Sequence, residues 1–310
     1  MRALVLVVGA VLASSATRAE PDLGRPKNHL ESEYFRKHFT VTWEAPAALP
    51  ADAELEIGDG SGHGGTLGWF RFRPGKDWVG VLLIQFDEGW QPYKSQWPPD
   101  RAPVTVKSAH MKPDAYAALL RDLAAVNAAK LKPVELDAFG SSTTDLWASA
   151  RLNAGGKALV DLNWAGYDGA TTAVESAKPR AVAALARDAV QGLDFKDHAP
   201  TDEERGWASA KFARDWTKFK DLKFHWWVRE RYIETIGVVG NKAILPTLRD
   251  ILASDPPKDG RREASDERCV YHAINAVTRL LKTDVRDTPV EEMDLEKTRR
   301  KVLDLLRDRK

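Results

Sequence analysis

The sequence contains a single cysteine, Cys269, in a chain of 310 residues. One cysteine cannot form an intrachain disulfide, so the fold has to be stabilised by packing rather than by cross-links. Cys269 lies beside Val270 in a helical pattern of apolar residues, which favours a buried, inert thiol over a reactive one. The eleven tryptophans can supply much of the apolar surface that such packing requires, since each buries roughly 150–250 Å².

The chain also lacks an excess of either charge and any long hydrophobic run. Its formal net charge is +1, so electrostatics give no reason to expect nucleic acid or an anionic membrane as a partner. The apolar run at residues 3–12 is shorter than the roughly 18 residues needed to span a bilayer. It follows Arg2 and precedes a small-residue site at 17–19, a pattern typical of a secretory signal peptide at 1–19. We therefore expect a soluble protein that is secreted or periplasmic, without a stable membrane anchor after cleavage.

Motifs of cofactor, metal or nucleophile chemistry are weak or missing. The stretch GDGSGHGG (58–65) satisfies G-x-G-x-x-G through Gly60, Gly62 and Gly65, but a strand-like segment follows it. A dinucleotide fingerprint has to open a helix, so we interpret this stretch as a hairpin loop. The seven histidines are scattered, with no HExxH pair and no cluster with cysteine. FGSSTTD (139–145) lacks the G-x-S-x-G elbow. We predict no cofactor, no metal ion and no catalytic residue.

Residues 39–198 have the pattern of an α+β domain with a mostly antiparallel sheet and flanking helices. An exposed leader, residues 20–38, precedes them. Runs rich in branched and aromatic residues, separated by Gly and Pro, predict strands at 39–44, 53–57, 66–72, 79–86, 103–109, 144–152 and 157–165. Helices are predicted from Pro113 and at about 172–191. Because the strands are clustered and do not alternate regularly with helices, an α+β arrangement is favoured over a parallel one.

Residues 199–310 are predicted to form an all-α domain. Thr201 and Glu204 have the spacing of a capping box, in which each side chain bonds the backbone amide of the other residue. The helix that they open is rich in aromatic residues, and residues 267–281 place apolar side chains on one helical stripe. The change in pattern at 199 therefore indicates a second, helical domain.

One part of this region resembles a known repeat. The stretch ETIGVVGNKAILPTLRDIL (234–252) is similar to the centre of a HEAT-type helical repeat, which it matches at Gly237, Gly240, Asn241, Ile244, Pro246, Leu248 and Leu252. Residues 267–281 resemble the first helix of a following repeat, so the resemblance covers about residues 223–306. Such repeats generally serve as protein-interaction scaffolds and carry no fixed catalytic residues. Since only two units are visible and at least three usually form a stable array, we expect the aromatic helix after Thr201 to dock them onto the first domain.

Two stretches are candidate contact surfaces. The segment 86–103 is long for a loop, and its aromatic residues could stack on a sugar or a peptide, or fold back as a lid on the sheet. The segment 254–265 is a basic connection between helices, where repeat proteins often bind partners, although a solvated linker is the alternative. The candidate ligand-binding or partner-binding residues are Trp90, Tyr93, Trp97, Arg261 and Arg262.

From these features we expect an exported, non-enzymatic binding or scaffold protein that contacts its partner through the concave helical surface and the 86–103 loop. The alternative is a polysaccharide-binding or polysaccharide-processing protein that uses the loop tryptophans. Glycosidase-type chemistry would need two carboxylates held about 5–9.5 Å apart. The carboxylates available for such a pair are Asp87, Glu88, Asp145, Asp161 and Asp168. The expected partner is accordingly a protein or a glycan, and enzymatic activity stays open.

Overall fold

The computed structural model describes residues 49–61, 67–86, 104–128, 145–167, 182–219, 226–254, 264–283 and 294–307, with short pieces at 39–40, 130–131 and 285. The predicted signal peptide and leader, residues 1–38, lie outside this part of the chain.

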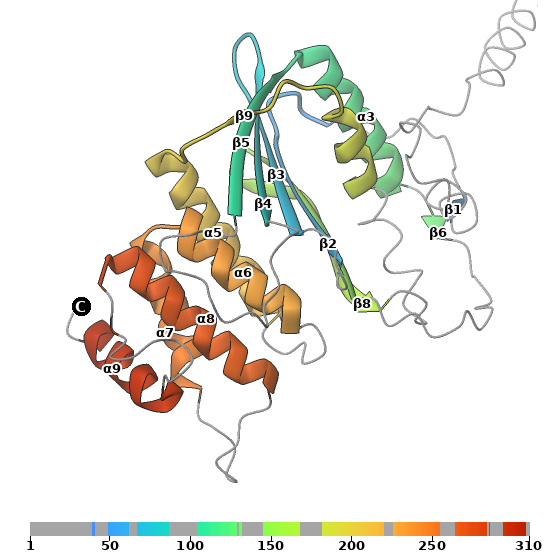
Figure 1. The fold of residues 1–310 in the computed structure, drawn as a ribbon. Coiled ribbons are helices and arrows are strands. Elements are labelled where there is room, and N and C mark those ends of the chain that lie inside the picture. Colours follow the sequence, from blue (N-terminus) through green and yellow to red (C-terminus); the bar gives the residue numbers. More distant parts are fainter. Residues whose placement is uncertain are drawn as a thin grey trace, which may run out of the picture.

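The fold is α+β, with a seven-stranded antiparallel sheet in the first half of the chain and helices in the second (Figure 1). The strand order is β8-β7-β2-β3-β4-β5-β9. Its members are β2 Glu54–Ser61, β3 Leu67–Pro74, β4 Val79–Phe86, β5 Val104–Met111, β7 Asp145–Ala154, β8 Lys157–Tyr167 and β9 Lys196–Asp197. Two further short strands, β1 Phe39–Thr40 and β6 Lys130–Leu131, pair with each other. The α+β prediction with an antiparallel sheet is therefore confirmed.

Helices cover both faces of the large sheet. On one face lie α3 Pro113–Ala128 and a helix that includes residues 182–189. On the other side are the remaining helices, α5 Asp202–Phe219, α6 Trp226–Val239, the 3-10 turn η1 Lys242–Ile244, α7 Leu245–Ala253, α8 Ala264–Leu281 and α9 Leu295–Arg307. Figure 1 shows α5 and α6 beside the sheet, with α8 and α9 farther from it. None of the helices in the described ranges is long and apolar enough to cross a bilayer.

The central strands bury side chains on both sides because both faces of the sheet are covered. Along β3, Phe70 and Phe72 face α3, whereas Trp69 and Arg71 face the later helices. Tyr116 of α3 stacks against Phe72 and donates a hydrogen bond to the backbone carbonyl of Ala53 at 2.6 Å. This contact anchors α3 at the start of the sheet.

The second face of the sheet shares one apolar core with the helices. Trp69 and Trp147 of the sheet both contact Tyr232 of α6, with ring centroids 4.6 and 5.3 Å apart. Phe212 of α5 packs against the same tyrosine at 5.7 Å. The cluster continues without a break through buried residues of α7, α8 and α9, including Val302. The later helices therefore pack on the sheet and share its core, and they do not form a separate core of their own.

The connections of the helical part follow their local sequence. Glu204 accepts a hydrogen bond from the Thr201 amide at 2.8 Å, and the Glu204 amide donates to the Thr201 hydroxyl at 3.3 Å, so the predicted capping box is confirmed. Asn241 caps η1 by accepting from the Ala243 amide. Proline stands in the first turn of α7, where its missing donor costs nothing. Residues 234–252 thus form the helix, corner and helix that the sequence predicted.

Two glycines are required by close contacts. A Cβ on Gly58 would lie 2.0 Å from the indole of Trp147, and a Cβ on Gly237 of α6 would lie 2.8 Å from the Cα of Ala276 on α8. β2 continues to Ser61 instead of ending at Ile57 as predicted, because residues 58–61 pair with β7. Gly58 makes room for the indole of Trp147 and is not part of a turn.

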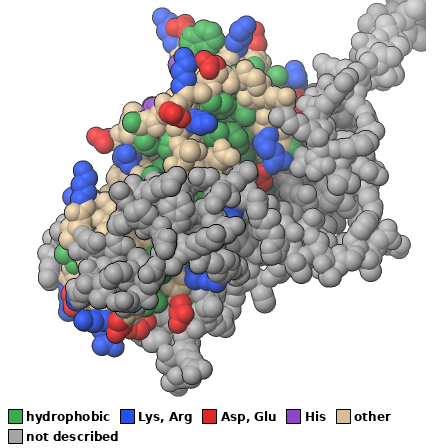
Figure 2. All heavy atoms as spheres, in the orientation of Figure 1, with side chains coloured by type: hydrophobic (Ala, Val, Ile, Leu, Met, Phe, Trp, Pro, Cys, Tyr) green, Lys and Arg blue, Asp and Glu red, His purple; other side chains and the backbone are tan. Residues whose placement is uncertain are grey.

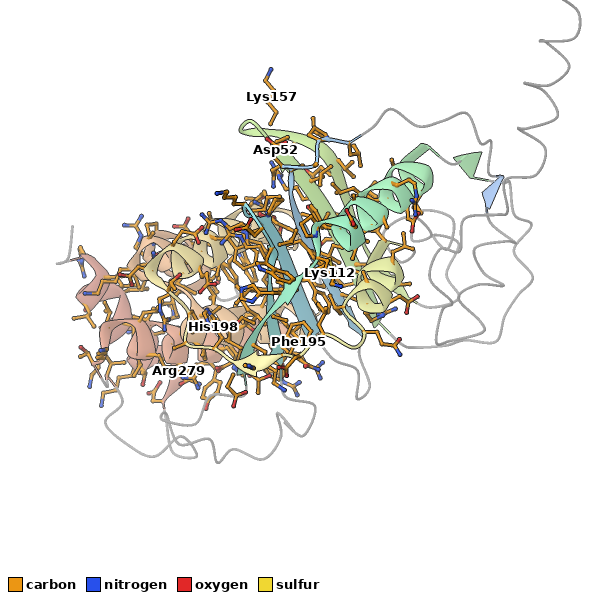
Figure 3. All side chains as sticks on the ribbon, turned by 90° about the horizontal axis from the view of Figure 1, so that it is seen from above. Asp52, Lys112, Lys157, Phe195, His198 and Arg279 are labelled. Carbon is orange, nitrogen blue, oxygen red and sulfur yellow. The ribbon has the colours of Figure 1, made fainter. Side chains whose placement is uncertain are left out.

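β8 is one of the two edge strands of the sheet, and it carries features that discourage pairing with another chain. Leu152 pairs with Val160 and Asn153 with Ala158, so Leu159 has no opposite residue in β7 and forms a bulge. Lys157 begins the strand and projects away from the body of the molecule (Figure 3). Bulges and charged residues are the usual protection of an edge strand.

Candidate functional site

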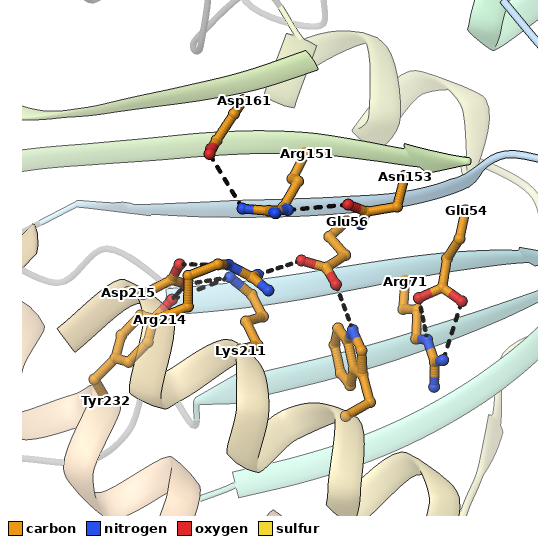
Figure 4. Close-up of polar contacts among 11 residues, drawn as sticks. Glu54, Glu56, Arg71, Arg151, Asn153, Asp161, Lys211, Arg214, Asp215 and Tyr232 are labelled. Carbon is orange, nitrogen blue, oxygen red and sulfur yellow. Dashed lines mark hydrogen bonds and ion pairs between the residues drawn. The ribbon is translucent and has the colours of Figure 1, made fainter. Parts of the chain in front are cut away.

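Charged side chains gather where α5 crosses the sheet (Figure 4). We call this group the junction cluster; it consists of Glu56, Arg151, Asp161, Lys211, Arg214 and Asp215. Together with Ser149 and Asn163 these residues line a pocket with about 230 Å³ of empty space, part of which is open to solvent. β2, β7 and β8 supply one wall, and α5 supplies the other.

Glu56 is the link between the sheet and α5. It is buried, with 4% of its surface exposed. One carboxylate oxygen accepts a hydrogen bond from the indole of Trp207 at 2.8 Å, and the other forms an ion pair with Arg214. Burial alone would lower the pKa of Arg214, but the charges of Glu56 and Asp215 outweigh it and raise the pKa. The guanidinium is therefore charged at every accessible pH and holds Glu56 in place.

Lys211 is a buried cation surrounded by aromatic rings. Its residue is 2% exposed, and its ammonium lies 5.4 Å from the ring centroid of Trp69 and 5.7 Å from that of Trp147. The ammonium pairs with Asp215, one turn along α5, and lies 3.2 Å from the hydroxyl of Tyr232. An aromatic face attracts a cation, by roughly 2 kcal/mol where both are desolvated.

Asp215 completes this buried arrangement. It accepts a hydrogen bond from the Tyr232 hydroxyl at 2.6 Å. Burial would raise the pKa of Asp215, but the charge and hydrogen bond of Lys211 together with the bond from Tyr232 lower it. Burial and the neighbouring Asp215 charge raise the pKa of Tyr232 well above its usual range. The aspartate is therefore ionised and the tyrosine neutral near neutral pH.

A second set of ion pairs lies beside the cluster. Arg71 binds Glu54 through two bonds of 2.8 and 3.0 Å, and it also donates to Glu203 of α5 at 2.7 Å. Its guanidinium lies 4.9 Å from the ring centroid of Trp207. Arg73 contacts the other oxygen of Glu203 at 2.7 Å. The first turn of α5 is thus fixed to β2 and β3 as well.

The open side of the pocket is formed by β7 and β8. Arg151 donates to Asp161 at 3.1 Å and to Asn153 at 3.0 Å. The Asp161 side chain is 41% exposed and that of Arg151 is 25% exposed, so this pair is in contact with water. Exposed pairs of this kind contribute little to stability, about 0–1 kcal/mol.

The arrangement suits the packing of α5 on the sheet better than the binding of a ligand. The pocket's empty space of about 230 Å³, which includes open solvent, is smaller than the roughly 300–1,000 Å³ of a typical ligand pocket. Its three cationic and three anionic side chains are paired with one another across the pocket and the helix. A ligand would have to break these pairs, whereas α5 and the sheet are joined by them.

The comparisons with known proteins find nothing similar. No protein-family model matches this chain, and no curated protein or solved structure matches it significantly. The resemblance of residues 234–252 to HEAT-type repeats therefore stays a prediction.

The residues proposed from the sequence lie outside the described part of the chain. This holds for Trp90, Tyr93, Trp97, Arg261 and Arg262, so their role as ligand-binding or partner-binding residues stays a prediction. Of the carboxylates considered for glycosidase chemistry, Asp161 is the one whose side chain is described, and it is paired with Arg151. In the ranges that the structure covers, no group of three or more His, Cys, Asp or Glu side chains is placed to hold a metal ion.

The junction cluster was missed because its contacts join distant parts of the chain. A partial signal was present in β2 and β3, where charged residues recur at every second position, at Glu54, Glu56, Arg71 and Arg73. Such alternation places all four on one face of the sheet. The apolar residues between them pointed to one covered face, but the sequence did not show that charged partners cover the other.

Proposed function

We propose that the protein is an exported, non-enzymatic binding protein in which helices α6–α9 form a protein-binding scaffold mounted on the sheet. The observation that carries this proposal is the core that the helices share with the sheet. It covers the side of α5 and α6 that faces the strands and fixes the helical part in one orientation. Rigid mounting lowers the entropy lost on binding a partner.

The exposed surface of the helical part lies on α7 and α9, which contact each other. In α7, Arg249 and Asp250 are exposed, while Leu248 and Leu252 are buried. In α9 the exposed residues recur every three or four positions and are charged at Lys297, Arg300, Asp304 and Arg307. We call the exposed residues of α7 and α9 the outer helical face.

The charges of the outer helical face make it suitable for a polar, specific contact. Its exposed charged residues include both signs, with Asp250 beside Arg249 on α7 and Asp304 between Arg300 and Arg307 on α9. Where Figure 2 shows the described surface uncovered, basic and acidic side chains are also interspersed. Mixed charges of this kind fix the register and selectivity of a protein complex more than they add affinity. They therefore favour a folded protein partner over a polyanion.

Two further observations support the proposal. The segment at 1–19 has the pattern of a secretory signal, which supports export. The buried charges of the junction cluster are paired with one another, which supports a structural use of these groups over a catalytic one. Catalytic acids and bases usually line a site where the reacting atom of a substrate can come within reach of them.

Photo-cross-linking in envelope extracts of the source organism tests the proposal. A photoreactive residue replaces Arg249 or Arg300, and Lys157 on the far hairpin serves as the control position. We expect one protein to be captured from both helical positions and not from the control. With that protein purified, Arg249→Glu combined with Arg300→Glu should weaken binding about tenfold, whereas Lys157→Glu should not.

Equal capture from all three positions, or from none, would refute a partner-binding role for this face. A panel of soluble glycans, read by protection of tryptophan fluorescence from a quencher, would then decide whether the carbohydrate alternative takes its place.

A further inference from the structure

Glu230 on α6 is a buried carboxylic acid without a hydrogen bond. Its residue is 0% exposed, and neither carboxylate oxygen has a hydrogen-bond partner within the described part of the chain. Two basic groups of α8 approach it: the Nε of Arg268 lies 3.8 Å from Oε1, and the Nε2 of His272 lies 3.9 Å from Oε2. Both distances exceed those of a hydrogen bond. The structure therefore brings acid and base close together without bonding them.

His272 lies between two carboxylates. Its Nδ1 is 2.6 Å from Oε1 of Glu234, and its Nε2 faces Glu230. Glu234 also pairs with Arg279 and accepts a bond from Asn275 at 3.4 Å. Burial would raise the pKa of Glu234, but the hydrogen bond and charge of His272 and the charge of Arg279 lower it to about 2.

The consequence is a fixed orientation of the imidazole. An ionised Glu234 can only accept, so the Nδ1 of His272 carries the hydrogen. The Nε2 of His272 is then the nitrogen that faces Glu230. Burial raises the pKa of Glu230 to about 7 in spite of the positive charges of His272 and Arg268. Glu230 therefore changes its charge near neutral pH, where Glu234 does not.

The other elements around Glu230 supply mainly positive charge. On α6 itself Arg229 and Arg231 flank it, and the Arg231 guanidinium lies 5.3 Å from the ring of Phe86 on β4. The nearest charged pair of α5, Lys211 with Asp215, contacts Tyr232 instead. No acid in the described part of these elements other than Glu234 is placed beside it. An ionised Glu230 would therefore have positive charge nearby but no donor within hydrogen-bond distance.

We propose that Glu230 and His272 form a proton-dependent latch between α6 and α8. Below the transition the neutral carboxyl group remains buried between the two helices. Above it the O–H bond of Glu230 breaks and the proton passes to water, which leaves a carboxylate without a donor in a buried site. Such a group is strongly unfavourable, so the start of α8 moves away from α6 and water enters.

The position of the latch makes the effect local. Two turns farther along α6, Gly237 is in close contact with Ala276 of α8, and no side chain separates the helices there. That contact does not titrate. The loosening should therefore begin at the Glu230 end of the helix pair, with the Gly237 contact as its fixed point.

Hydrogen–deuterium exchange of the full chain measures this directly. From the pKa of about 7, the opening equilibrium of α6 and α8 should rise about tenfold between about pH 6 and about pH 8, after correction for intrinsic exchange. Glu230→Gln should abolish this rise. Peptides from α3, which lies on the opposite face of the sheet, should show no such change in either protein.

Infrared difference spectroscopy on the wild-type protein supplies a second readout that needs no variant to fold. The carbonyl band of a protonated, buried carboxylic acid should disappear over the same pH range, and it should be missing from Glu230→Gln. A band that titrates in the ordinary carboxyl range would overturn the latch. So would a pH-dependent rise in exchange that persists in Glu230→Gln.

Discussion

Replacing Lys211 by methionine should destabilise the protein strongly, although the two side chains are similar in length and both are compatible with a helix. The substitution leaves Asp215 buried beside two tryptophans without its main counter-charge. Breaking a buried ion pair on one side costs about 3–5 kcal/mol. Tyr232 still donates to Asp215, and the Nε of Arg214 lies 3.6 Å from its other oxygen. We therefore expect the lower end of that range, about 3 kcal/mol.

The pH dependence of this loss has a definite sign. In the wild type the pKa of Asp215 is below its unfolded value, so its contribution to stability is present above that value and is lost as the pH falls through the folded pKa. Without Lys211, burial should raise the pKa of Asp215 instead. Asp215 then protonates readily in acid, and the difference between variant and wild type should shrink as the pH falls through the carboxyl range.

Urea unfolding followed by tryptophan fluorescence is the assay, because Trp69 and Trp147 lie next to the ammonium. Lys157→Met makes the same chemical change at an exposed lysine and should alter the free energy of unfolding by less than about 0.5 kcal/mol. The double variant Lys211→Met with Asp215→Asn removes both charges and should recover about 2 kcal/mol of the loss.

The double variant distinguishes the effect of the uncompensated charge from the effect of lost packing. If it is as unstable as Lys211→Met, the lost stability comes from packing and cation–π contact rather than from the uncompensated aspartate. A single variant as stable as the Lys157 control would refute the argument altogether.

Two further predictions concern other contacts. Gly58→Ala should cost about 2–3 kcal/mol, because an added methyl overlaps the indole of Trp147 at 2.0 Å; Gly68→Ala, with its nearest atom 4.0 Å away, is the matched control in urea unfolding. Glu234→Gln should cost about 3 kcal/mol near neutral pH, since the folded pKa of about 2 lies below the unfolded 4.5. That stability is lost as the pH falls toward 2, so thermal unfolding in acid should no longer separate the glutamine variant from the wild type.

Elements with local signals were predictable from the sequence. The capping box at Thr201 joins residues three positions apart, and the strands at 67–74 and 79–86 have a period of two or a continuous apolar run bounded by Gly and Pro. The predicted end of β2 at residue 57 was wrong, because Gly58 and Gly60 are also turn signals. Gly58 is instead required by the indole of Trp147, which lies in a strand about ninety positions later in the chain.

The candidate site was beyond the reach of local patterns. Glu56 is separated by 151 positions from Trp207 and by 158 from Arg214. No spacing rule links residues so far apart, and a charged residue in a strand is by default read as solvent-exposed. The same holds for Glu230 and His272, whose partnership depends on how α6 crosses α8. Chemistry that depends on tertiary contacts of this kind becomes visible only in the fold.

The shared core has a consequence for the order in which the chain can fold. Within the described part of the chain, the helical residues that pack on the sheet face of Trp69, Ile84 and Trp147 come from Asp202 onward, which is synthesised last. Until they arrive, the strands present an apolar surface of the kind that leads to aggregation. Folding of this face therefore has to wait for the residues from Asp202 onward. A fragment that stops at Pro200 would keep the strands but lose the helices that cover their apolar face.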